Sequence, residues 1–207
     1  MIILIGLLFT ILSIIWFILW FNRNPKRFPP TSNVIVSPAD GTVIYVKEVK
    51  PGVKPTPQKF GKDIQLDELN GINLFSNGFY IIGIYLSAWD VHVTRAPISG
   101  RIISIRNKRG RLFSKSLFHF KTLDERSTCI IQGVDNTVGV VHMAAYLVRR
   151  IVLSVEAWKA VRIGEPIGKI RLGSQVDLII SQIDNIIVKI KAGDRVRAGE
   201  SIVAVPK

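Results

Sequence analysis

The chain has 207 residues, of which 48% are hydrophobic, and its 28 Lys and Arg against 15 Asp and Glu give a formal net charge of +13. This length suits a single domain with a sizeable core, and the charge indicates an anionic partner: nucleic acid, an acidic lipid surface or an anionic substrate. A lone cysteine, Cys129, excludes a disulfide framework and a thiolate metal cluster. The histidines at positions 92, 119 and 142 show no metal-ligand spacing, so no metal site is expected.

Residues 2–21 read IILIGLLFTILSIIWFILWF, a run without a single charge. A helix of this length spans roughly 30 Å, the hydrocarbon thickness of a bilayer, and Trp16 and Trp20 stand where an aromatic belt belongs. A cleavable signal peptide needs a basic start and a small-residue cleavage site, and a core helix is rarely apolar on every face. Residues 1–22 are therefore predicted to form a transmembrane anchor.

Residues 23–33 form a basic, proline-rich connector that contains Arg23, Lys26, Arg27 and the pair Pro29-Pro30. Prolines end the helix, and the cations are expected near acidic headgroups. Because the first charges follow the apolar run, the positive-inside rule places the C-terminal domain on the cytoplasmic side of the cell (plasma) membrane. No second apolar stretch of that length follows, so a single-pass protein is expected.

Residues 34–207 consist of short runs rich in β-branched residues, interrupted by Gly and Pro, and are predicted to form one mostly β domain. The expected strands are Val34–Val36, Thr42–Val49, Phe79–Leu86, Arg101–Arg106, Cys129–Gln132, Val138–His142, Val176–Ile180, Ile186–Lys191 and Ser201–Val205. Met143–Ser154 fits a short helix or a strand equally well. Lys47–Gln65 has no clear period and is expected to be a mobile loop.

Three stretches place a glycine turn before a strand: Pro38-Ala-Asp-Gly41, Pro97-Ile-Ser-Gly100 and Lys191–Glu200. The last stretch resembles the turn of lipoyl-type hairpins, which favours a compact barrel-sandwich. The basic turn Lys108–Arg111 is followed by Leu112, Phe113, Leu117 and Phe118. This pattern fits a loop that dips into a membrane interface, and it fits an ordinary solvated loop equally well.

Candidate chemistry centres on the dipeptide Gly173-Ser174 and on two other loop residues, Asp40 and His92. A hydroxyl becomes a nucleophile when a base takes its proton, and a carboxylate holds an imidazole in the required tautomer. The bland alternatives are a Gly-Ser turn, a turn-forming Asp40 and a buried core histidine. These residues alone leave both interpretations open.

The motifs around these residues are more specific: Asn24-Pro-Lys-Arg, Ser37-Pro-Ala-Asp-Gly41, Tyr85-Leu-Ser-x-x-Asp-Val-His-Val-x-Arg-x-Pro-x-x-Gly100 and Leu172-Gly-Ser-Gln-Val-Asp177. In this order and spacing the chain resembles the short prokaryotic form of phosphatidylserine decarboxylase, a pyruvoyl-dependent family, over nearly its whole length. Leu123-Asp-Glu-Arg-Ser127 stands where the family has an N-E-R-N-like stretch and departs from it at both asparagines.

The resemblance implies a proenzyme in which the Ser174 hydroxyl attacks the Gly173 carbonyl and cuts the chain into 1–173 and 174–207, which stay associated. Ser174 then becomes a covalent pyruvoyl cofactor, which forms a Schiff base with the serine headgroup of phosphatidylserine; loss of CO₂ gives phosphatidylethanolamine. His92 and Asp40 are the implied catalytic partners, and no metal is required.

The chain departs from longer family members at one position of the histidine loop. Those proteins carry H-x-x-H, the second histidine being assigned to self-cleavage, whereas the second position here is Arg95. Arginine is a poor proton acceptor, so His92 serves both steps or the base is arranged differently, and Arg95 is a candidate for binding a substrate carboxylate or phosphate. His119 and His142 have no counterpart in the family motifs and are predicted to be structural.

Several alternatives remain from the sequence alone. The same chemistry on archaetidylserine, the serine-headgroup ether lipid of archaea, touches no readable motif. A membrane-tethered basic module that binds nucleic acid accounts for the charge but not for the ordered motifs, and a lipoyl-like interaction domain without catalysis makes Ser174 a mere turn. The expected partners are an anionic phospholipid and the membrane, without nucleic acid, and a homodimer is one option for the oligomeric state.

Overall fold

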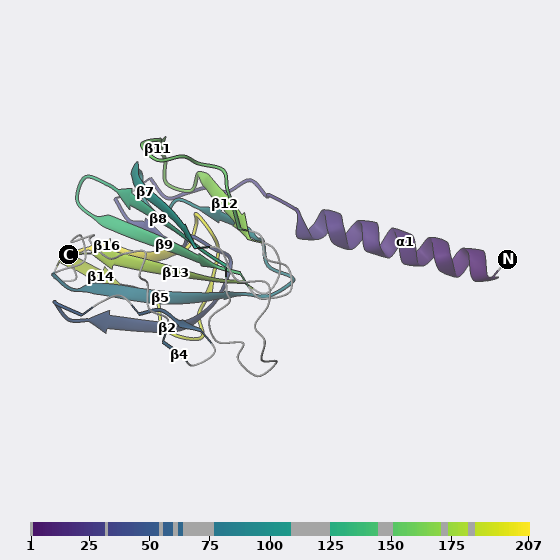
Figure 1. Ribbon diagram of the computed structural model, residues 1–207, viewed down its shortest axis with the longest axis horizontal. Coiled ribbons are helices and arrows are strands. Elements are labelled where there is room, and N and C mark those ends of the chain that lie inside the picture. Colours follow the sequence, from purple (N-terminus) through teal and green to yellow (C-terminus); the bar gives the residue numbers. More distant parts are fainter. Residues whose placement is uncertain are drawn as a thin grey trace.

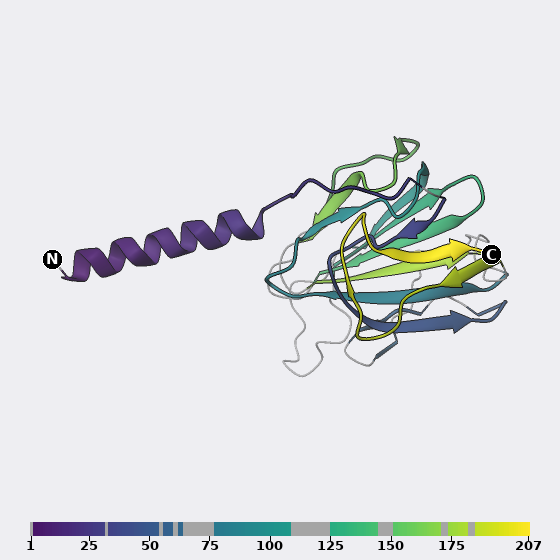
Figure 2. The ribbon, with the colours of Figure 1, turned by 180° about the vertical axis from the view of Figure 1, so that it is seen from behind.

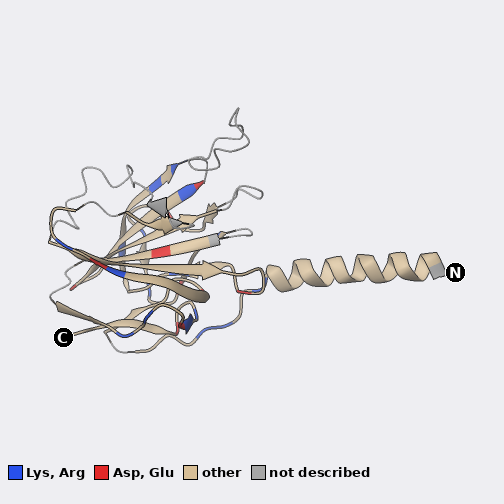
Figure 3. Cartoon of the chain, turned by 90° about the horizontal axis from the view of Figure 1, so that it is seen from below, with Lys and Arg blue, Asp and Glu red and all other residues tan. Residues whose placement is uncertain are grey.

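The structure is a computed structural model that describes residues 2–31, 33–53, 56–59, 62–63, 77–108, 125–144, 151–170, 174–181 and 185–207. The predicted N-terminal helix is present as α1 (Ile2–Phe21), which is long and apolar enough to cross a membrane. Figure 3 shows it extending from the domain without a charged residue along its length. Apolar side chains from Ile3 to Leu19 are exposed, as expected for a lipid-facing helix, whereas Phe21 at its end is buried.

The rest of the described chain forms antiparallel sheets, as the β-branched runs predict. The large sheet has the order β11 (Ala160–Val161), β7 (Gly100–Lys108), β8 (Arg126–Gln132), β9 (Thr137–Met143), β13 (Ser174–Ser181), β5 (Phe79–Leu86), β2 (Gly41–Val49) and β15 (Arg195–Val196). Smaller sheets are β1 (Ile35–Val36), β16 (Ile202–Pro206) and β14 (Ile186–Val188); β10 (Ile151–Leu153), β12 (Pro166–Ile170) and β6 (Val93–Arg95); and the pair β3 (Gln58–Lys59) and β4 (Lys62–Asp63).

The main core lies between one face of the curled large sheet and the two three-stranded sheets (Figure 1). Alternate residues of β13, namely Val176, Leu178 and Ile180, enter this core together with Ile167 of β12 and Val203 of β16. The opposite face of the large sheet carries a second buried cluster that includes Ile179. Both faces of β13 are therefore buried, and the second face also holds the buried polar residues Gln175 and Asp177.

Two glycines of the repeated turn pattern mark close approaches between strands. A Cβ at Gly41, where φ is +153°, would lie 2.2 Å from the carbonyl oxygen of Tyr85 on β5. A Cβ at Gly100 would lie 2.3 Å from the carbonyl oxygen of Gln132 on β8. The pattern therefore starts β2 and β7 at positions where no side chain fits.

The expectation of a mostly β sandwich with an N-terminal apolar helix is confirmed, and each of the nine expected strands overlaps an observed one. Short strands β6, β11, β12 and β15 were missed because they are too brief to show alternation. Residues 151–153 of Met143–Ser154 form strand β10, and Lys47–Gln65 contains the end of β2 and the short pair β3–β4. The basic turn Lys108–Arg111 and the apolar residues after it lie outside the described residues, apart from Lys108 at the end of β7.

α1 leaves the sandwich at one end, and the C-terminus lies at the opposite end (Figures 1 and 2). The connector then runs back along the domain to β1. The end of the sandwich that adjoins α1 carries the candidate site.

Candidate active site

The dipeptide Gly173-Ser174 lies between two fixed points of the fold. Ser174 is the first residue of β13 and pairs with Leu86, the last residue of β5. Ile170, the last residue of β12, donates its backbone N–H to the carbonyl oxygen of His92 at 3.1 Å. Gly173 and the side chain of Ser174 lie outside the described parts of the structure, whereas the backbones of Ile170 and Ser174 both lie at the end of the sandwich that carries the loop after β5.

His92 lies in that loop, between β5 and β6, and is completely buried. Its Nδ1 is 2.9 Å from the carbonyl oxygen of Asp90, which can only accept, so Nδ1 carries the proton. Nε2 is then an unprotonated acceptor, and it is buried with no hydrogen-bond partner in the described structure. Burial lowers the pKa of His92 below its usual value. The result is a neutral imidazole with a free basic nitrogen, which suits a proton acceptor.

The C-terminal end of α1 forms one wall around this imidazole. The ring of Phe21 lies 4.1 Å from the ring of His92, centroid to centroid. One turn earlier, Phe17 meets Trp89 edge-on at 6.3 Å, and Arg23 donates to the carbonyl oxygen of Trp89 at 2.5 Å. α1 is therefore docked on the loop that carries His92 and is more than a tether.

Asp40 is buried in the turn before β2 and binds the connector. Arg27 Nη2 donates to its Oδ2 at 2.6 Å, and the backbone N–H of Ala198 donates to its Oδ1 at 2.7 Å. Arg27 also binds Glu200 at 3.0 Å. Within the described residues no hydrogen bond joins Asp40 to His92, so the structure does not bring together the carboxylate and imidazole in the way the sequence suggested.

Arg95 is buried on β6, and its guanidinium also binds the connector. Nη2 donates to Asn24 Oδ1 at 2.5 Å and to the carbonyl oxygen of Pro25 at 3.0 Å, while Nη1 donates to the carbonyl oxygen of Gly164 at 2.8 Å. Burial, and next the nearby charge of Arg27, lower its pKa from the ordinary value. Binding of a substrate anion by Arg95 stays a prediction; the observed bonds hold the connector against the domain.

Asp90 is a carboxylate of the site that the sequence reasoning passed over. Its carboxylate accepts hydrogen bonds from the backbone N–H and the hydroxyl of Ser87 and forms an ion pair with Arg195 at 2.6 Å. Burial alone raises the pKa of this carboxyl, but the hydrogen bonds from Arg195 and Ser87 lower it overall. The signal was present, because Asp90 stands two residues before His92 in the quoted motif.

Asp177, three residues after Ser174 on β13, is a second carboxylate that the sequence motifs did not single out. Asp177 is completely buried and accepts hydrogen bonds from the hydroxyl of Tyr45 and, at 2.8 Å, from Gln175 Nε2. Burial, and next the charge of Asp177, raise the pKa of Tyr45, so the phenol stays protonated and donates. This network fixes the second face of β13 near its beginning.

His142 is structural, as expected. Its Nε2 is 2.9 Å from the hydroxyl of Thr94 and its Nδ1 is 3.1 Å from the carbonyl oxygen of Ser127, so both ring nitrogens have partners. Complete burial lowers its pKa to about 4. His119 lies outside the described residues.

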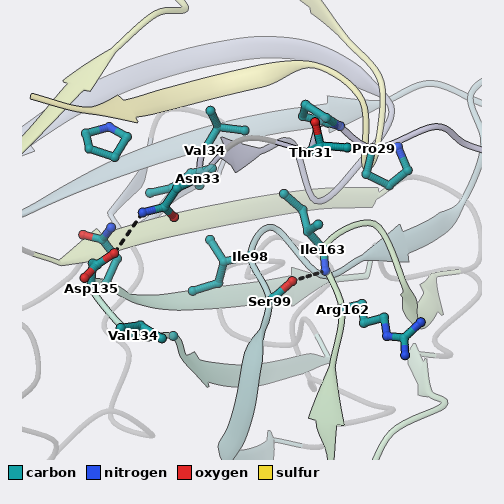
Figure 4. A pocket seen from close by; sticks show the side chains of 15 residues that line it. Pro29, Thr31, Asn33, Val34, Ile98, Ser99, Val134, Asp135, Arg162 and Ile163 are labelled. Atoms are coloured by element: carbon teal, nitrogen blue, oxygen red, sulfur yellow. Dashed lines mark hydrogen bonds between the residues drawn. The ribbon is translucent and has the colours of Figure 1, made fainter.

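Two cavities adjoin the connector, and the larger one is not near the candidate residues. It measures about 550 Å³ and lies between Pro29, Ile98, Val134 and Ile163, with Asp135 engaged by Asn33 at 2.9 Å (Figure 4). The smaller cavity, about 370 Å³, is lined by Asp40, Asp90 and three arginines. The smaller cavity is the better candidate for a binding site, because charged side chains line it and one of them, Asp90, belongs to the His92 loop.

Comparison with known proteins agrees with this geometry. A sequence model described as phosphatidylserine decarboxylase matches residues 14–204. The chain is 40% identical over 199 residues, 96% of its length and 94% of the other's, to a protein of Methanocaldococcus jannaschii provisionally named archaetidylserine decarboxylase proenzyme. It is 33% identical over 187 residues, 89% of its length and 71% of the other's, to a protein of Saccharopolyspora erythraea named phosphatidylserine decarboxylase proenzyme.

Proposed function

Since the chain belongs to the phosphatidylserine decarboxylase family, we propose that it removes CO₂ from the serine headgroup of a membrane phospholipid after cutting itself between Gly173 and Ser174. The observation that carries this proposal is that the backbone of Ser174 and the His92 loop lie at the same end of the sandwich. The strand pairing of Ser174 with Leu86 and the bond from Ile170 to the His92 backbone bring both to one end of the sandwich. The word proenzyme in the relatives' names fits a chain that is processed.

Self-cleavage requires no group beyond this chain and water. The Ser174 hydroxyl attacks the Gly173 carbonyl carbon, the peptide C–N bond breaks, and the acyl group moves from nitrogen to oxygen. Elimination of the resulting ester releases Gly173 as a new carboxyl terminus and leaves dehydroalanine at position 174. Hydrolysis of its imine form releases ammonia and leaves a pyruvoyl group. Glycine at 173 presents no side chain to the attacking oxygen.

His92 is the proton carrier that the geometry offers for these steps. Its Nδ1 is committed to the carbonyl oxygen of Asp90, and its buried Nε2 is available to accept the hydroxyl proton. The depressed pKa keeps the imidazole neutral, and thus able to accept, near neutral pH. The carbonyl oxygen of Asp90 thereby fixes the tautomer, the task the sequence suggested for Asp40.

The residues around position 174 fit a pyruvoyl group. Once Nε2 of His92, which is buried and unpartnered, has taken up the Ser174 hydroxyl proton, its N–H could donate to a carbonyl oxygen of such a group. When formed, the group supplies an electron sink for the loss of CO₂ from an amine-linked substrate. His92 then holds the proton that the product requires, and Phe21 keeps bulk water from one side of the imidazole.

The proposed organisation is a membrane anchor over residues 1–22, a connector over 23–33 and a decarboxylase domain over 34–207. The apolar α1 supports membrane attachment, and Arg23, Lys26 and Arg27 directly after it support a cytoplasmic catalytic domain. The docking of α1 on the His92 loop supports a reaction next to the bilayer surface, where a lipid headgroup is available.

Two lipids fit the proposal, phosphatidylserine and archaetidylserine. They share the serine headgroup and differ in the chains, which no described residue of the site contacts in a way that selects between them. The higher identity to the relative named for archaetidylserine favours that lipid.

The test is release of labelled CO₂ from each lipid by the purified protein in neutral detergent, compared with His92→Ala. We expect the wild-type protein to release CO₂ and the variant to lose self-cleavage or turnover by at least about a hundredfold. A variant that cleaves and turns over at the wild-type rate would remove His92 from the mechanism. A wild-type chain that stays whole and binds nucleic acid instead would support the basic binding module.

A further inference from the structure

The smaller cavity is a basic recess, here called the arginine pocket, at the point where the membrane helix meets the domain. Its volume is about 370 Å³, and it is lined by Arg23, Asp40, Trp89, Asp90, Arg195, Val196, Arg197 and Ser201. Arg23 comes two residues after α1, whereas Arg195 lies on β15 and Arg197 directly follows that strand. Two segments distant in sequence thus bring three guanidinium groups to one recess.

The carboxylates in the arginine pocket are already engaged. Asp40 accepts from Arg27 and from the N–H of Ala198, while Asp90 accepts from Ser87 and Arg195. Their oxygens therefore leave little capacity for another cation.

Two of the arginines, Arg23 and Arg197, form no direct ion pair with a carboxylate within the described parts of the chain, although the charge of Arg197 acts on Glu200. Arg23 donates only to the carbonyl oxygens of Trp20 and Trp89. At Arg197 the backbone N–H donates a hydrogen bond to Ser201 Oγ, and the side chain is exposed. The recess therefore keeps an excess of positive charge and unused N–H donors, as an anion-binding site requires.

The arginine pocket lies at the depth of lipid headgroups if α1 spans the bilayer. Arg23 stacks on Trp20 in the last turn of α1, with its guanidinium carbon 4.0 Å from the ring centroid. Trp89 is 61% exposed although it lies beside Phe17 of the same helix. Tryptophan prefers the membrane–water interface and arginine prefers phosphate, so these residues mark the headgroup layer.

The pocket is also within reach of the candidate reaction centre. Gln175, Tyr85, Thr42 and Arg195 pair in one row across β13, β5, β2 and β15. Neighbouring strands are about 4.8 Å apart, so the backbone of Arg195 lies roughly 14 Å from that of Gln175. The long arginine side chains shorten this distance, which leaves a span suited to a small headgroup.

We infer that the arginine pocket binds the phosphate of the lipid whose serine headgroup reacts at position 174. Arg197 and Arg23 supply the free donors, and Asp90 holds Arg195 at the rim. This inference rests on the proposed function for the identity of the lipid, but its chemistry, a membrane-borne phosphate, follows from the charges and the depth of the recess.

The experiment counts bound lipid without requiring turnover. The protein is purified in neutral detergent, mixed with dioleoyl phosphatidylserine and examined by native mass spectrometry, beside Arg197→Gln and Arg23→Gln. Arg101→Gln is the matched control, since Arg101 is an exposed arginine on β7 that does not line the arginine pocket. Inorganic phosphate in excess is added in a second arm to separate a headgroup site from a site for free phosphate.

We expect Arg197→Gln and Arg23→Gln each to weaken lipid binding about tenfold and Arg101→Gln to leave it unchanged. In turnover assays Arg197→Gln should raise KM for the lipid with little change in kcat and with self-cleavage intact. Equal lipid binding by Arg197→Gln and the wild-type protein overturns the inference, as does full displacement of the lipid by inorganic phosphate.

The proposed function and the arginine pocket can be refuted independently of each other. If Arg197→Gln loses the lipid adducts but the wild-type protein stays uncut and releases no CO₂, the proposed function is refuted and the arginine pocket is retained. If the wild-type protein cuts itself and decarboxylates the lipid, and Arg197→Gln binds and turns over the lipid equally well, the arginine pocket is refuted and the proposed function is retained.

Discussion

The ring of Phe21, the last residue of α1, lies 4.1 Å from the imidazole of His92, centroid to centroid. The connector that follows continues the same relationship: Asn24 and Pro25 accept hydrogen bonds from Arg95, and Arg27 pairs with Asp40. Arg95 and Asp40 therefore bind the segment that joins α1 to the domain, while His92 packs against the end of α1 itself. The residues that hold α1 on the domain are thus also residues of the site.

Phe21→Ala should slow self-cleavage and change its pH dependence. Without the phenyl ring, water reaches His92, so its pKa rises from the depressed value toward the ordinary one near 6.5. The neutral base is then lost at a higher pH, and the midpoint of the cleavage rate against pH moves upward. The misplaced imidazole should also cost about tenfold or more in the rate on the plateau.

Phe9→Ala is the control for that experiment, because Phe9 is exposed on the same helix far from the domain. Cleavage is followed on a denaturing gel after translation in detergent or nanodiscs at a series of pH values. An unchanged rate and midpoint in Phe21→Ala would show that the ring contact has no bearing on the base.

Arg95→Gln should loosen the connector. The substitution removes donors to Asn24, Pro25 and Gly164 while it keeps a polar side chain of similar reach. Limited trypsin digestion should then cut faster after Lys26 and Arg27 than in the wild-type protein, by about tenfold for the loss of charge-assisted bonds.

The same digestion of Arg101→Gln provides the baseline, since it removes an exposed arginine from β7. If Arg95→Gln resists trypsin as well as the wild type does, but no longer binds lipid, Arg95 contacts the substrate as the sequence suggested. Faster digestion with unchanged lipid affinity supports the role in holding the connector.

Much of the fold was predictable, because the long strands carry runs rich in β-branched and other apolar residues. The run from Val176 to Ile180 and the charge-free helix carried their own signals, and the glycine turns at Gly41 and Gly100 marked strand starts. The short strands β6 and β12 were not, because two to five residues carry no period and tertiary pairing alone defines them.

The site was predictable as a set of residues but not as a set of contacts. The motifs identified Asp40, His92 and Ser174, yet the partner of Asp40 is Arg27, whose position depends on the path of the connector. Asp90 supplies a backbone carbonyl to His92, a contact that no side-chain pattern reveals. The path of the chain in three dimensions, rather than the residue types, decides which of these residues pair.

Acid should destabilise the folded domain through His142. Its pKa of about 4 in the folded state is below the value near 6.5 of an unfolded histidine. Between these two pKa values the unfolded chain binds a proton that the folded chain excludes. The contribution of His142 to the free energy of unfolding is therefore fully present above pH 6.5 and is lost as the pH falls toward 4. The depressed pKa of His92 acts in the same direction.

For His142 alone the loss of unfolding free energy by about pH 5 is of the order of 2 kcal/mol, or roughly 5 °C in Tm. Thermal unfolding in detergent at pH 7.5 and 5 measures it, with His142→Gln for comparison. The variant should be less stable at pH 7.5 but lose less on acidification. Equal acid sensitivity in both proteins would show that His142 does not set the pH dependence.

Intact mass spectrometry of the denatured wild-type protein, beside Ser174→Ala, tests the central claim most directly. The account predicts two wild-type chains, residues 1–173 and a fragment 174–207 whose first residue carries the mass of a pyruvoyl group instead of serine, and a single uncut chain for the variant. A wild-type protein that decarboxylates the lipid while it remains one chain with an intact serine at position 174 would contradict it.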